Sequence, residues 1–424
     1  MDNSKKKSLA FPAEKGLTKE IRVAVLFQRF GPYHHARLNA AGRLLSVWGV
    51  EACAMEDTYA WDKVEGAQTF TRITLTDRDS GDRRWRQELH RKMWQALEEI
   101  KPQVVVIPGW SFADALSALW WCVQSNVPAV VMSESTAWDD KRHAGKEWVK
   151  RRLIKLNSAG LAGGTPHRDY LVQLGLMREQ VFLGYDVVDN EYFRCESGKA
   201  RTDAASLRSR LGLPVKYFLA SARFVEKKNL FRLIQAFGRY RVLAGKSGVG
   251  NPELENWSLV LLGDGPLKSD LQKFISELGL QASVQLPGFK QYDELPAYFG
   301  LASAFVHAST TEQWGLVVNE AMAAGLPVLV SNRCDCALDL VKDGVNGFTF
   351  DPGDTETLAN LMFRLADGQF PIAEYGIASQ RLVSTWGPER FATGLRDAVA
   401  VALKNPRPRA GIIDRLLLRL MLCR

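Results

Sequence analysis

Two glutamates in one short stretch of this chain, Glu312 and Glu320, have the spacing of residues that serve a single ligand. They are eight positions apart, a little over two turns of a helix with about 3.6 residues per turn. Gly315 lies between them where a helix would begin, and a glycine allows a ligand to approach the backbone closely. The N–H groups of Leu316 and Val317 would then point toward an anion. A site that binds phosphate and has a carboxylate on either side to bind hydroxyl groups suits a sugar nucleotide.

A pair of cations, Arg223 and Lys228, follows a strand that we predict at 217–222. Ligands of open α/β sheets bind beyond the carboxyl ends of the strands, so these side chains are placed to hold a diphosphate. The turn after the next predicted strand contains Gly263 and Gly265 but lacks the third glycine of a dinucleotide-binding fingerprint. We therefore expect Gly265 to let a nucleotide lie against the backbone.

The elements that must position these residues alternate between strands and helices along the chain. Strands are predicted at 21–27, 50–54, 70–75, 104–108, 129–133, 217–222, 258–262, 304–307 and 328–330, and helices at 84–100, 112–124, 230–243 and from 316. Ser309, Thr310 and Thr311 are expected to cap the last of these helices. Alternation of this kind predicts an α/β fold with parallel, doubly wound sheets.

The composition is that of an ordinary globular protein, with 424 residues of which 46% are hydrophobic and 24% charged. The chain has no run of about 18 apolar residues that would cross a membrane. Its first 20 residues lack the apolar core of a secretory signal, and its six scattered cysteines fit a reducing compartment. We therefore expect a cytoplasmic protein. Cys334 and Cys336 have no second Cys/His cluster nearby, so we expect loop residues and no metal site.

The net charge of +8 and the pI near 9.1 predict an anionic partner. Nucleotide phosphates and a membrane surface are the candidates, whereas nucleic acid is not expected because the sequence contains no recognised nucleic-acid-binding module. A basic helix at 141–155 and an apolar, arginine-bearing tail at 412–424 would supply a contact with anionic lipid on the inner face of the membrane. The alternatives are a solvated surface helix for the first segment and a helix docked on the protein itself for the second.

The stretch 306–331 resembles the E-x7-E segment of the retaining glycosyltransferases of family 4, which are enzymes of the GT-B fold. The segment with Arg223 and Lys228 resembles the R-x4-K signature of the same family. The resemblance covers most of 21–403 and is strongest over 218–353. It implies two doubly wound Rossmann-like domains that face each other across a cleft.

The resemblance also implies roles for individual residues. Glu312 would contact the donor sugar and Glu320 the ribose of the nucleotide. Arg223 and Lys228 would hold the donor phosphates, which makes Glu312, Arg223 and Lys228 the expected catalytic residues. The donor-binding residues would further include Gly31, Gly265, Gln313, Gly315, Leu316, Val317 and, at the edge that binds the base, Phe289.

Two positions depart from the family pattern. Many members carry a histidine after the strand that corresponds to 129–133, and this chain has Glu134 in that region instead. We expect Glu134 to be a further catalytic residue that positions the sugar, with His34 and His35 as alternative contacts to the sugar or acceptor. Asp335 stands where related sequences often have glycine, which changes the loop that faces the sugar.

The expected organisation has five parts. They are a polar leader at 1–20, an N-terminal acceptor-side domain at 21–195, a C-terminal nucleotide-sugar-binding domain at 204–385, a terminal helix at 386–404 and a basic amphipathic tail at 406–424. The boundary between the domains is placed in the polar, poorly patterned stretch 193–204. In the family, the terminal helix packs back on the first domain.

The function predicted from this resemblance is a retaining hexosyltransferase that moves a sugar from a nucleotide-sugar donor to a glycan or lipid-linked acceptor in cell-surface polysaccharide biosynthesis. Fixed cations and helix N–H groups would stabilise the departing diphosphate, so neither a metal nor another cofactor is expected. Two alternatives are a nucleotide-sugar epimerase and a non-catalytic protein that binds sugar nucleotides.

Overall fold

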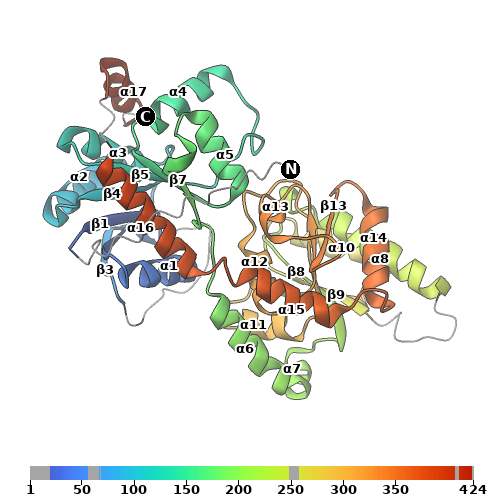
Figure 1. Ribbon diagram of the computed structural model, residues 1–424. Coiled ribbons are helices and arrows are strands. Elements are labelled where there is room, and N and C mark those ends of the chain that lie inside the picture. The colour runs from blue at the N-terminus through green and yellow to red at the C-terminus, as the bar shows by residue number, and fades with distance from the viewer. Residues whose placement is uncertain (1–19, 56–65, 67, 248–256, 406–409, 423–424) are drawn as a thin grey trace, which may run out of the picture.

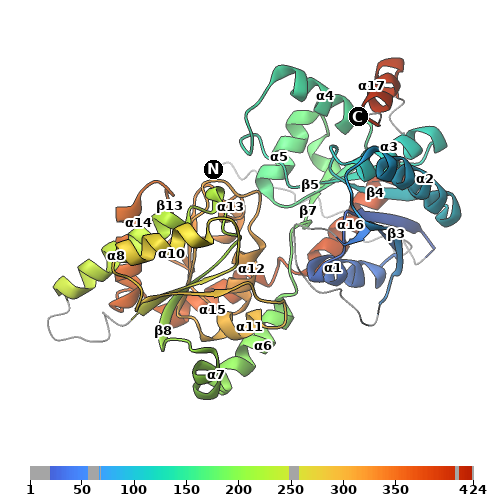
Figure 2. The same ribbon diagram turned by 180° about the vertical axis from the view of Figure 1, so that it is seen from behind.

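The protein folds into two α/β domains, each built on a fully parallel sheet with helices packed against it (Figures 1 and 2). The computed structural model describes residues 20–55, 66, 68–247, 257–405 and 410–422. The predicted leader therefore lies outside the described residues except for Glu20. The two doubly wound domains agree with the predicted fold class.

The N-terminal domain contains a seven-stranded sheet in the order β3-β2-β1-β4-β5-β6-β7. Its strands are β1 (Arg22–Phe27), β2 (Ser46–Met55), β3 (Thr71–Arg78), β4 (Val104–Pro108), β5 (Ala129–Ser133), β6 (Ala159–Ala162) and β7 (Val181–Leu183). The helices are α1 (Pro32–Gly42), α2 (Arg83–Ile100), α3 (Ala113–Ser125), α4 (Ala144–Ile154) and α5 (Thr165–Leu174). The strand order reverses between β1 and β4, which opens a crevice at the carboxyl ends of the strands.

The C-terminal domain contains a six-stranded sheet in the order β10-β9-β8-β11-β12-β13. Its strands are β8 (Lys216–Ser221), β9 (Trp257–Leu262), β10 (Val284–Gly288), β11 (Ala304–His307), β12 (Val328–Ser331) and β13 (Gly347–Phe350). The helices are α7 (Ala204–Leu211), α8 (Leu230–Ser247), α10 (Lys268–Glu277), α11 (Leu295–Leu301), α12 (Leu316–Ala323), α13 (Cys336–Leu340), α14 (Thr355–Ala366) and α15 (Ile372–Val383). The order reverses between β8 and β11, the two strands that precede Lys228 and Glu312.

The stretch that the sequence marked as a domain boundary, 193–204, is occupied mostly by a helix, α6 (Asn190–Thr202). Its buried residues Phe193, Ser197 and Ala200 recur at helical spacing and pack against α11 and α12 of the C-terminal domain. The polar residues that suggested a linker form the outer face of this helix. The chain therefore crosses between the domains ahead of α6, after β7.

The last long helix, α16 (Pro388–Lys404), leaves the C-terminal domain and lies along the N-terminal one (Figure 1). It packs against α1, β6 and β7, and its buried face includes Phe391 and Leu395. Gly394 allows a close approach, because a Cβ atom there would lie 2.6 Å from the carbonyl oxygen of Leu183. The two domains are thus joined by two crossings of the chain.

The tail forms helix α17 (Ile412–Leu422), which docks on α3 and α4 of the N-terminal domain (Figure 2). Leu418 is fully buried in this contact, and Arg152 Nη1 lies 2.7 Å from Asp414 Oδ1. Residues 406–409 and 423–424 of the predicted tail lie outside the described residues. Among the helices of the described ranges, none combines the length and apolar character needed to span a bilayer.

Candidate functional site

The residues of the E-x7-E stretch occupy the connection from β11 to α12. Helix α12 begins at Leu316, as predicted, and Gly315 precedes it with a φ of 97°, a backbone conformation that favours glycine. The predicted cap at Ser309–Thr311 is not formed, because Gly315 occupies the cap position without a side-chain hydrogen bond. The first N–H groups of α12 have no acceptor within the helix, so its positive end is directed toward the space before Gly315.

Glu312 lies in front of this helix end and is held by three side chains on one oxygen. Lys228 Nζ donates to Glu312 Oε2, and His307 Nε2 and Ser309 Oγ each lie 3.3 Å from the same atom. Burial alone would raise the pKa of Glu312, but His307 and Lys228 hold it well below its usual range. Glu312 is therefore a carboxylate at neutral pH.

Lys228 reaches Glu312 because Asn229 anchors the turn that carries it. The turn Glu226–Lys228 follows β8, and Asn229 adopts a left-handed conformation with a φ of 59°. The Asn229 amide donates to the carbonyl oxygens of Ala308 at 3.0 Å and Pro352 at 2.8 Å. Sequence analysis did not assign Asn229 or His307 to the site, and it expected Ser309 only as a helix cap. The polar residues at the end of β11 and directly after Lys228 were the available signal.

The other predicted phosphate ligand, Arg223, lies apart from this cluster. Its side chain is exposed, and within the described part of the chain no hydrogen bond or ion pair joins it to Lys228 or Glu312. Its loop packs against Gly265, where a Cβ atom would lie 2.7 Å from the Phe224 carbonyl oxygen. The glycine thus makes room for the chain's own backbone, and its contact with a nucleotide stays a prediction.

Glu320 has the opposite electrostatic character to Glu312. It is fully buried within α12, and the hydroxyl of Tyr33 from the N-terminal domain donates to its Oε1. Its other oxygen, Oε2, has no hydrogen-bond partner among the residues that the structure describes. Burial raises the pKa of Glu320 to about 8, so the group carries a proton at neutral pH. The ring of Tyr33 packs edge-on against Tyr292, with centroids 5.8 Å apart.

The two histidines after β1 lie in different surroundings. His34 packs against Phe27 with ring centroids 4.4 Å apart, and its Nδ1 accepts from the N–H of Gly31 at 3.1 Å. Burial, with a smaller effect from Arg37, lowers the pKa of His34 to about 3. His35 Nδ1 lies 3.2 Å from the side-chain nitrogen of Asn39. None of the described contacts joins either histidine to Glu312 or Glu320.

In the described part of the chain, several polar contacts join the domains close to Glu312. His167 Nε2 lies 2.7 Å from the carbonyl oxygen of Gln313, and the indole N–H of Trp138 donates to Asp335 Oδ1 at 2.8 Å. Asp339 accepts from the N–H of Thr165 at 2.8 Å and from its hydroxyl at 2.7 Å, so it caps helix α5 from the opposite domain. Sequence analysis did not identify these pairs, whose partners are more than 140 positions apart.

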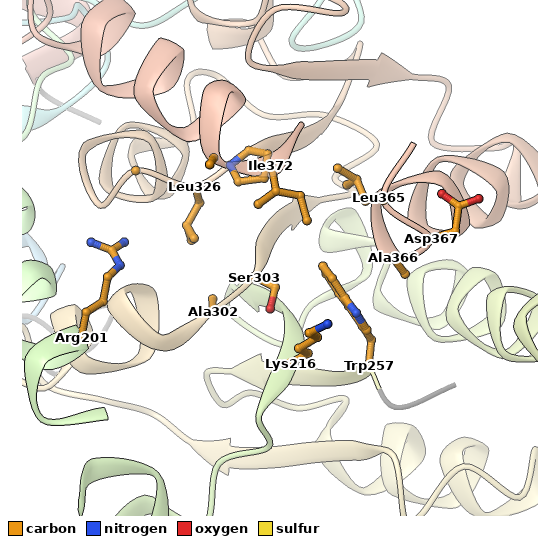
Figure 3. Close-up of a pocket in the computed structure, with 14 residues that line it drawn as sticks. Arg201, Lys216, Trp257, Ala302, Ser303, Leu326, Leu365, Ala366, Asp367 and Ile372 are labelled. Atoms are coloured by element: carbon orange, nitrogen blue, oxygen red, sulfur yellow. The ribbon is translucent and has the colours of Figure 1, made fainter. Parts of the chain in front are cut away.

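Two cavities lie away from the Lys228–Glu312 pair. One, of about 500 Å³, lies at the amino ends of β8 and β9 beside Lys216 and Trp257 (Figure 3). The other, of about 1150 Å³, lies between the domains beside α1 and the start of α6, and Tyr292 and His35 contribute to its lining. Neither cavity is lined by Arg223, Lys228 or Glu312.

The remaining predicted contacts are placed as follows. Phe289, directly after β10, is 39% exposed, which leaves its ring accessible at the edge of the second sheet. In the described part of the chain, no group of three or more His, Cys, Asp or Glu residues is arranged to hold a metal ion. Cys334 and Cys336 are buried free thiols whose pKa values are raised by burial.

Comparison with known proteins identifies relatives of this chain. Residues 206–375 match the family model "Glycosyl transferases group 1". The amylovoran biosynthesis glycosyltransferase AmsK of Erwinia amylovora is 30% identical over 253 residues, 58% of this chain and 57% of that protein. The lipopolysaccharide core biosynthesis glycosyltransferase LpsE of Rhizobium meliloti is 32% identical over 157 residues, 37% of this chain and 41% of that protein. The matches thus span about half the length of these curated relatives.

Among solved structures, Anabaena HepE in complex with UDP and glucose superposes with a TM-score of 0.65 at 19% identity. The match covers 90% of this chain and 99% of that one, so the likeness extends over both domains and shows a shared fold. Residues 206–375 are therefore similar to the glycosyl transferases group 1, and the chain as a whole has the two-domain GT-B fold.

Proposed function

We propose that this protein is a glycosyltransferase that moves a sugar from a nucleotide-sugar donor to a glycan or lipid-linked acceptor in cell-surface polysaccharide biosynthesis. The observation that carries the proposal is the Lys228–Glu312 ion pair in front of the amino end of α12. A cation and a helix N-terminus bind a diphosphate, and a carboxylate beside them binds sugar hydroxyls. The relatives AmsK and LpsE, whose names place them in polysaccharide and lipopolysaccharide biosynthesis, support the choice of substrates.

Donor binding would exchange the partners of this pair. In the structure the ammonium of Lys228 neutralises Glu312. A donor diphosphate would attract Lys228 more strongly, because it carries more negative charge. Glu312 would then be free to accept hydrogen bonds from the sugar, while the exposed Arg223 adds a second cation to the phosphates. The same charge stabilises the leaving nucleotide diphosphate as its bond to the sugar breaks.

Ribose binding would displace Tyr33 from Glu320. The Tyr33 hydroxyl covers one oxygen of a carboxyl group that is otherwise enclosed. A ribose hydroxyl has the same hydrogen-bonding capacity as the tyrosine hydroxyl, so it can replace Tyr33 at Glu320 once the domains separate. The contacts of Asp339 and Gln313 with the N-terminal domain would re-form after the donor has entered.

The stereochemical outcome and the metal requirement are part of the proposal. We propose retention, because the E-x7-E and R-x4-K residues resemble those of retaining enzymes. The leaving phosphate would take the proton of the acceptor hydroxyl as the new bond forms on the same face of the sugar. The cations and helix N–H groups around Glu312 would replace a metal in stabilising the diphosphate.

The first experiment is a thermal-shift screen with UDP-, GDP-, ADP- and TDP-sugars. A rise in melting temperature with one of them identifies the base, because a ligand that binds the folded state stabilises it.

Glu312→Ala should then abolish transfer while the circular-dichroism spectrum stays unchanged, and chelator should leave transfer intact. If Glu312→Ala transferred sugar at the wild-type rate, the Lys228–Glu312 pair would be excluded as the donor site. Epimerised donor in the absence of any acceptor would identify an epimerase, and tight binding without turnover a binding protein. No described feature favours either alternative.

We further propose that the protein works on the inner face of a membrane. Helix α17 buries Leu418 but exposes an apolar ridge of Ile412, Leu416 and Leu420, with Ile412 87% exposed. Exposed cations lie on α17 and on or directly after α4, against which α17 packs; they are Arg415, Arg419, Lys146, Arg151 and Lys155. An apolar ridge bordered by cations is the surface that binds anionic lipid.

Flotation with vesicles of anionic and of neutral phospholipid tests this surface. The triple variant Ile412→Ser, Leu416→Ser and Leu420→Ser should lose binding to the anionic vesicles. Val242→Ser is the control, because it removes one exposed apolar side chain from α8, far from the tail in the sequence. Equal flotation of the triple variant and the wild type would exclude α17 as the membrane contact.

A further inference from the structure

The amino end of α5, in the N-terminal domain, contacts the segment that follows Glu312 in the C-terminal domain. α5 lies beside α13 of the C-terminal domain in both views of the molecule (Figures 1 and 2). Trp314 packs against Gly164, where a Cβ atom would lie 2.3 Å from the Cζ3 atom of the indole. The rings of His167 and Trp314 have centroids 5.9 Å apart, and both side chains are almost completely buried. The segment after Glu312 is thus packed closely on the opposite domain.

The two ring nitrogens of His167 have different hydrogen-bonding roles. The N–H of Gly164 donates to Nδ1 at 2.9 Å, so Nδ1 is the nitrogen without a proton. Nε2 therefore carries the proton and donates to the carbonyl oxygen of Gln313 at 2.7 Å. Burial lowers the pKa of His167 to about 4, which leaves the ring neutral at neutral pH. One nitrogen thus serves the start of α5, and the other holds the opposite domain.

The hydrogen bond to Gln313 completes the support of the backbone at Glu312. Within the C-terminal domain, the N–H of Glu312 donates to the carbonyl oxygen of Arg333 at 3.2 Å, and its carbonyl oxygen accepts from the N–H of Asp335 at 3.1 Å. These two bonds tie Glu312 to the loop that follows β12. The next carbonyl group, that of Gln313, is held by His167 from the N-terminal domain. The chain at Glu312 is therefore fixed by both domains.

We propose that His167 is a positioning residue that fixes Glu312 against the donor sugar when the two domains are closed. This inference rests on the proposed function. A group that binds a substrate must be held within about 0.5 Å of its productive position, and a restraint on the carbonyl group of Gln313 restricts the backbone that carries the Glu312 side chain. Because His167 belongs to the other domain, this restraint exists only while the domains are in contact. Closure of the domains and placement of Glu312 are thereby linked.

Two substitutions separate the two hydrogen bonds of His167. The amide nitrogen of glutamine can take the position of Nε2, so His167→Gln keeps the donor to Gln313. The shorter asparagine can place its amide oxygen at the position of Nδ1, so His167→Asn keeps only the acceptor for the N–H of Gly164. A role confined to α5 would be preserved in His167→Asn, whereas a positioning role would be preserved in His167→Gln. Circular dichroism checks that each variant folds.

The measured quantity is the contribution of the sugar to binding, given by the Kd of UDP divided by the Kd of UDP-glucose in titration calorimetry. If the thermal-shift screen selects another sugar nucleotide, that compound and its nucleoside diphosphate are used. A weaker domain contact changes both Kd values alike and cancels in the ratio, whereas a displaced Glu312 affects only the sugar. We expect the ratio to fall about fivefold in His167→Asn, the usual effect of one lost hydrogen bond, and to stay within about twofold of the wild type in His167→Gln. Gln173→Asn, at an exposed position of α5, is the control and should keep the wild-type ratio.

The Glu312→Ala background tests whether His167 acts through Glu312. Adding His167→Asn to Glu312→Ala should change the ratio by less than about twofold, because the side chain that His167 positions is already absent. Gly164→Ala provides a second perturbation, since its Cβ atom would displace Trp314 while His167 is retained. It should lower the ratio as His167→Asn does, and it replaces that variant if His167→Asn does not fold.

Three results would overturn the inference and leave the proposed function standing. They are an unchanged ratio in His167→Asn (or in Gly164→Ala, if it replaces that variant), an equal fall in His167→Asn and His167→Gln, and a fall of the same size in the Glu312→Ala background. If the wild type binds neither the nucleoside diphosphates nor the sugar nucleotides, the proposed function is overturned and the inference with it.

Discussion

Replacing Lys228 with methionine tests whether the Lys228–Glu312 ion pair stabilises the donor-free site. Both side chains are mostly buried, each with 14% exposure. Removal of one partner from a buried ion pair leaves the other charge uncompensated and costs about 3–5 kcal/mol. His307 and Ser309 would still hold Glu312, each at 3.3 Å. We therefore expect a smaller loss of about 2–3 kcal/mol in the free energy of unfolding of the C-terminal domain.

Urea denaturation followed by tryptophan fluorescence at neutral pH measures this loss. Lys227→Met is the matched control, because it removes the same charge from an exposed neighbouring side chain, and it should change the free energy of unfolding by less than about 0.5 kcal/mol. The double variant Lys228→Met with Glu312→Gln removes both charges. Its loss in the free energy of unfolding should be smaller than the sum of the losses in the two single variants. We expect a difference of about 1–3 kcal/mol, which is the coupling energy of the pair.

The pH dependence gives a second check on the same pair. The folded-state pKa of Glu312 lies below the ordinary value of 4.5. The stabilisation by the pair is therefore present above pH 4.5 and is lost as the pH falls below that value. The wild type and Lys228→Met should converge in stability in acid. Equal stability of Lys228→Met and Lys227→Met at neutral pH, together with zero coupling to Glu312, would refute the argument.

Three further predictions concern Glu320 and the contact between the domains. The folded protein keeps the Glu320 proton up to about pH 8, whereas the unfolded chain releases it near pH 4.5. Between pH 4.5 and pH 8 the free energy of unfolding of the wild type should therefore fall relative to that of Glu320→Gln, by up to about 1.4 kcal/mol per pH unit. Urea denaturation at several pH values measures this difference, and the same pH dependence in both proteins would contradict it. Tyr33→Phe removes the hydroxyl that competes with ribose, so titration calorimetry should show donor binding about fivefold tighter; an unchanged Kd would contradict the competition. Asp339→Ala removes the cap on Thr165 and should weaken the closed arrangement by about 1 kcal/mol, seen as a larger radius of gyration in X-ray scattering; an unchanged radius would argue against this contact.

The sequence by itself determined the local features of the site. Apolar runs and turn residues placed the strands before Lys228 and Glu312, and Gly315 fixed the start of α12 at Leu316. These features depend on residues that are close together in the chain. Hydrophobic periodicity and the backbone freedom of glycine act over only a few residues, so the pattern is readable without the fold. The same method failed at 193–204, where the buried face of α6 was hidden among polar residues.

Only the tertiary structure decided what the two glutamates do electrostatically. Glu312 and Glu320 are the same residue type on one short stretch, but their pKa values shift in opposite directions. Glu312 receives a positive charge from Lys228, which is 84 positions away in the sequence. Glu320 receives a hydrogen bond from the hydroxyl of Tyr33, which is 287 positions away and covers the carboxyl group. A protonation state depends on the burial and the neighbours of a group, and folding brings those neighbours from distant parts of the chain. The sequence contains the groups, but their proximity arises only in the fold. Lys228 and Glu312 follow the neighbouring strands β8 and β11 of one sheet, whereas Tyr33 reaches Glu320 from the other domain.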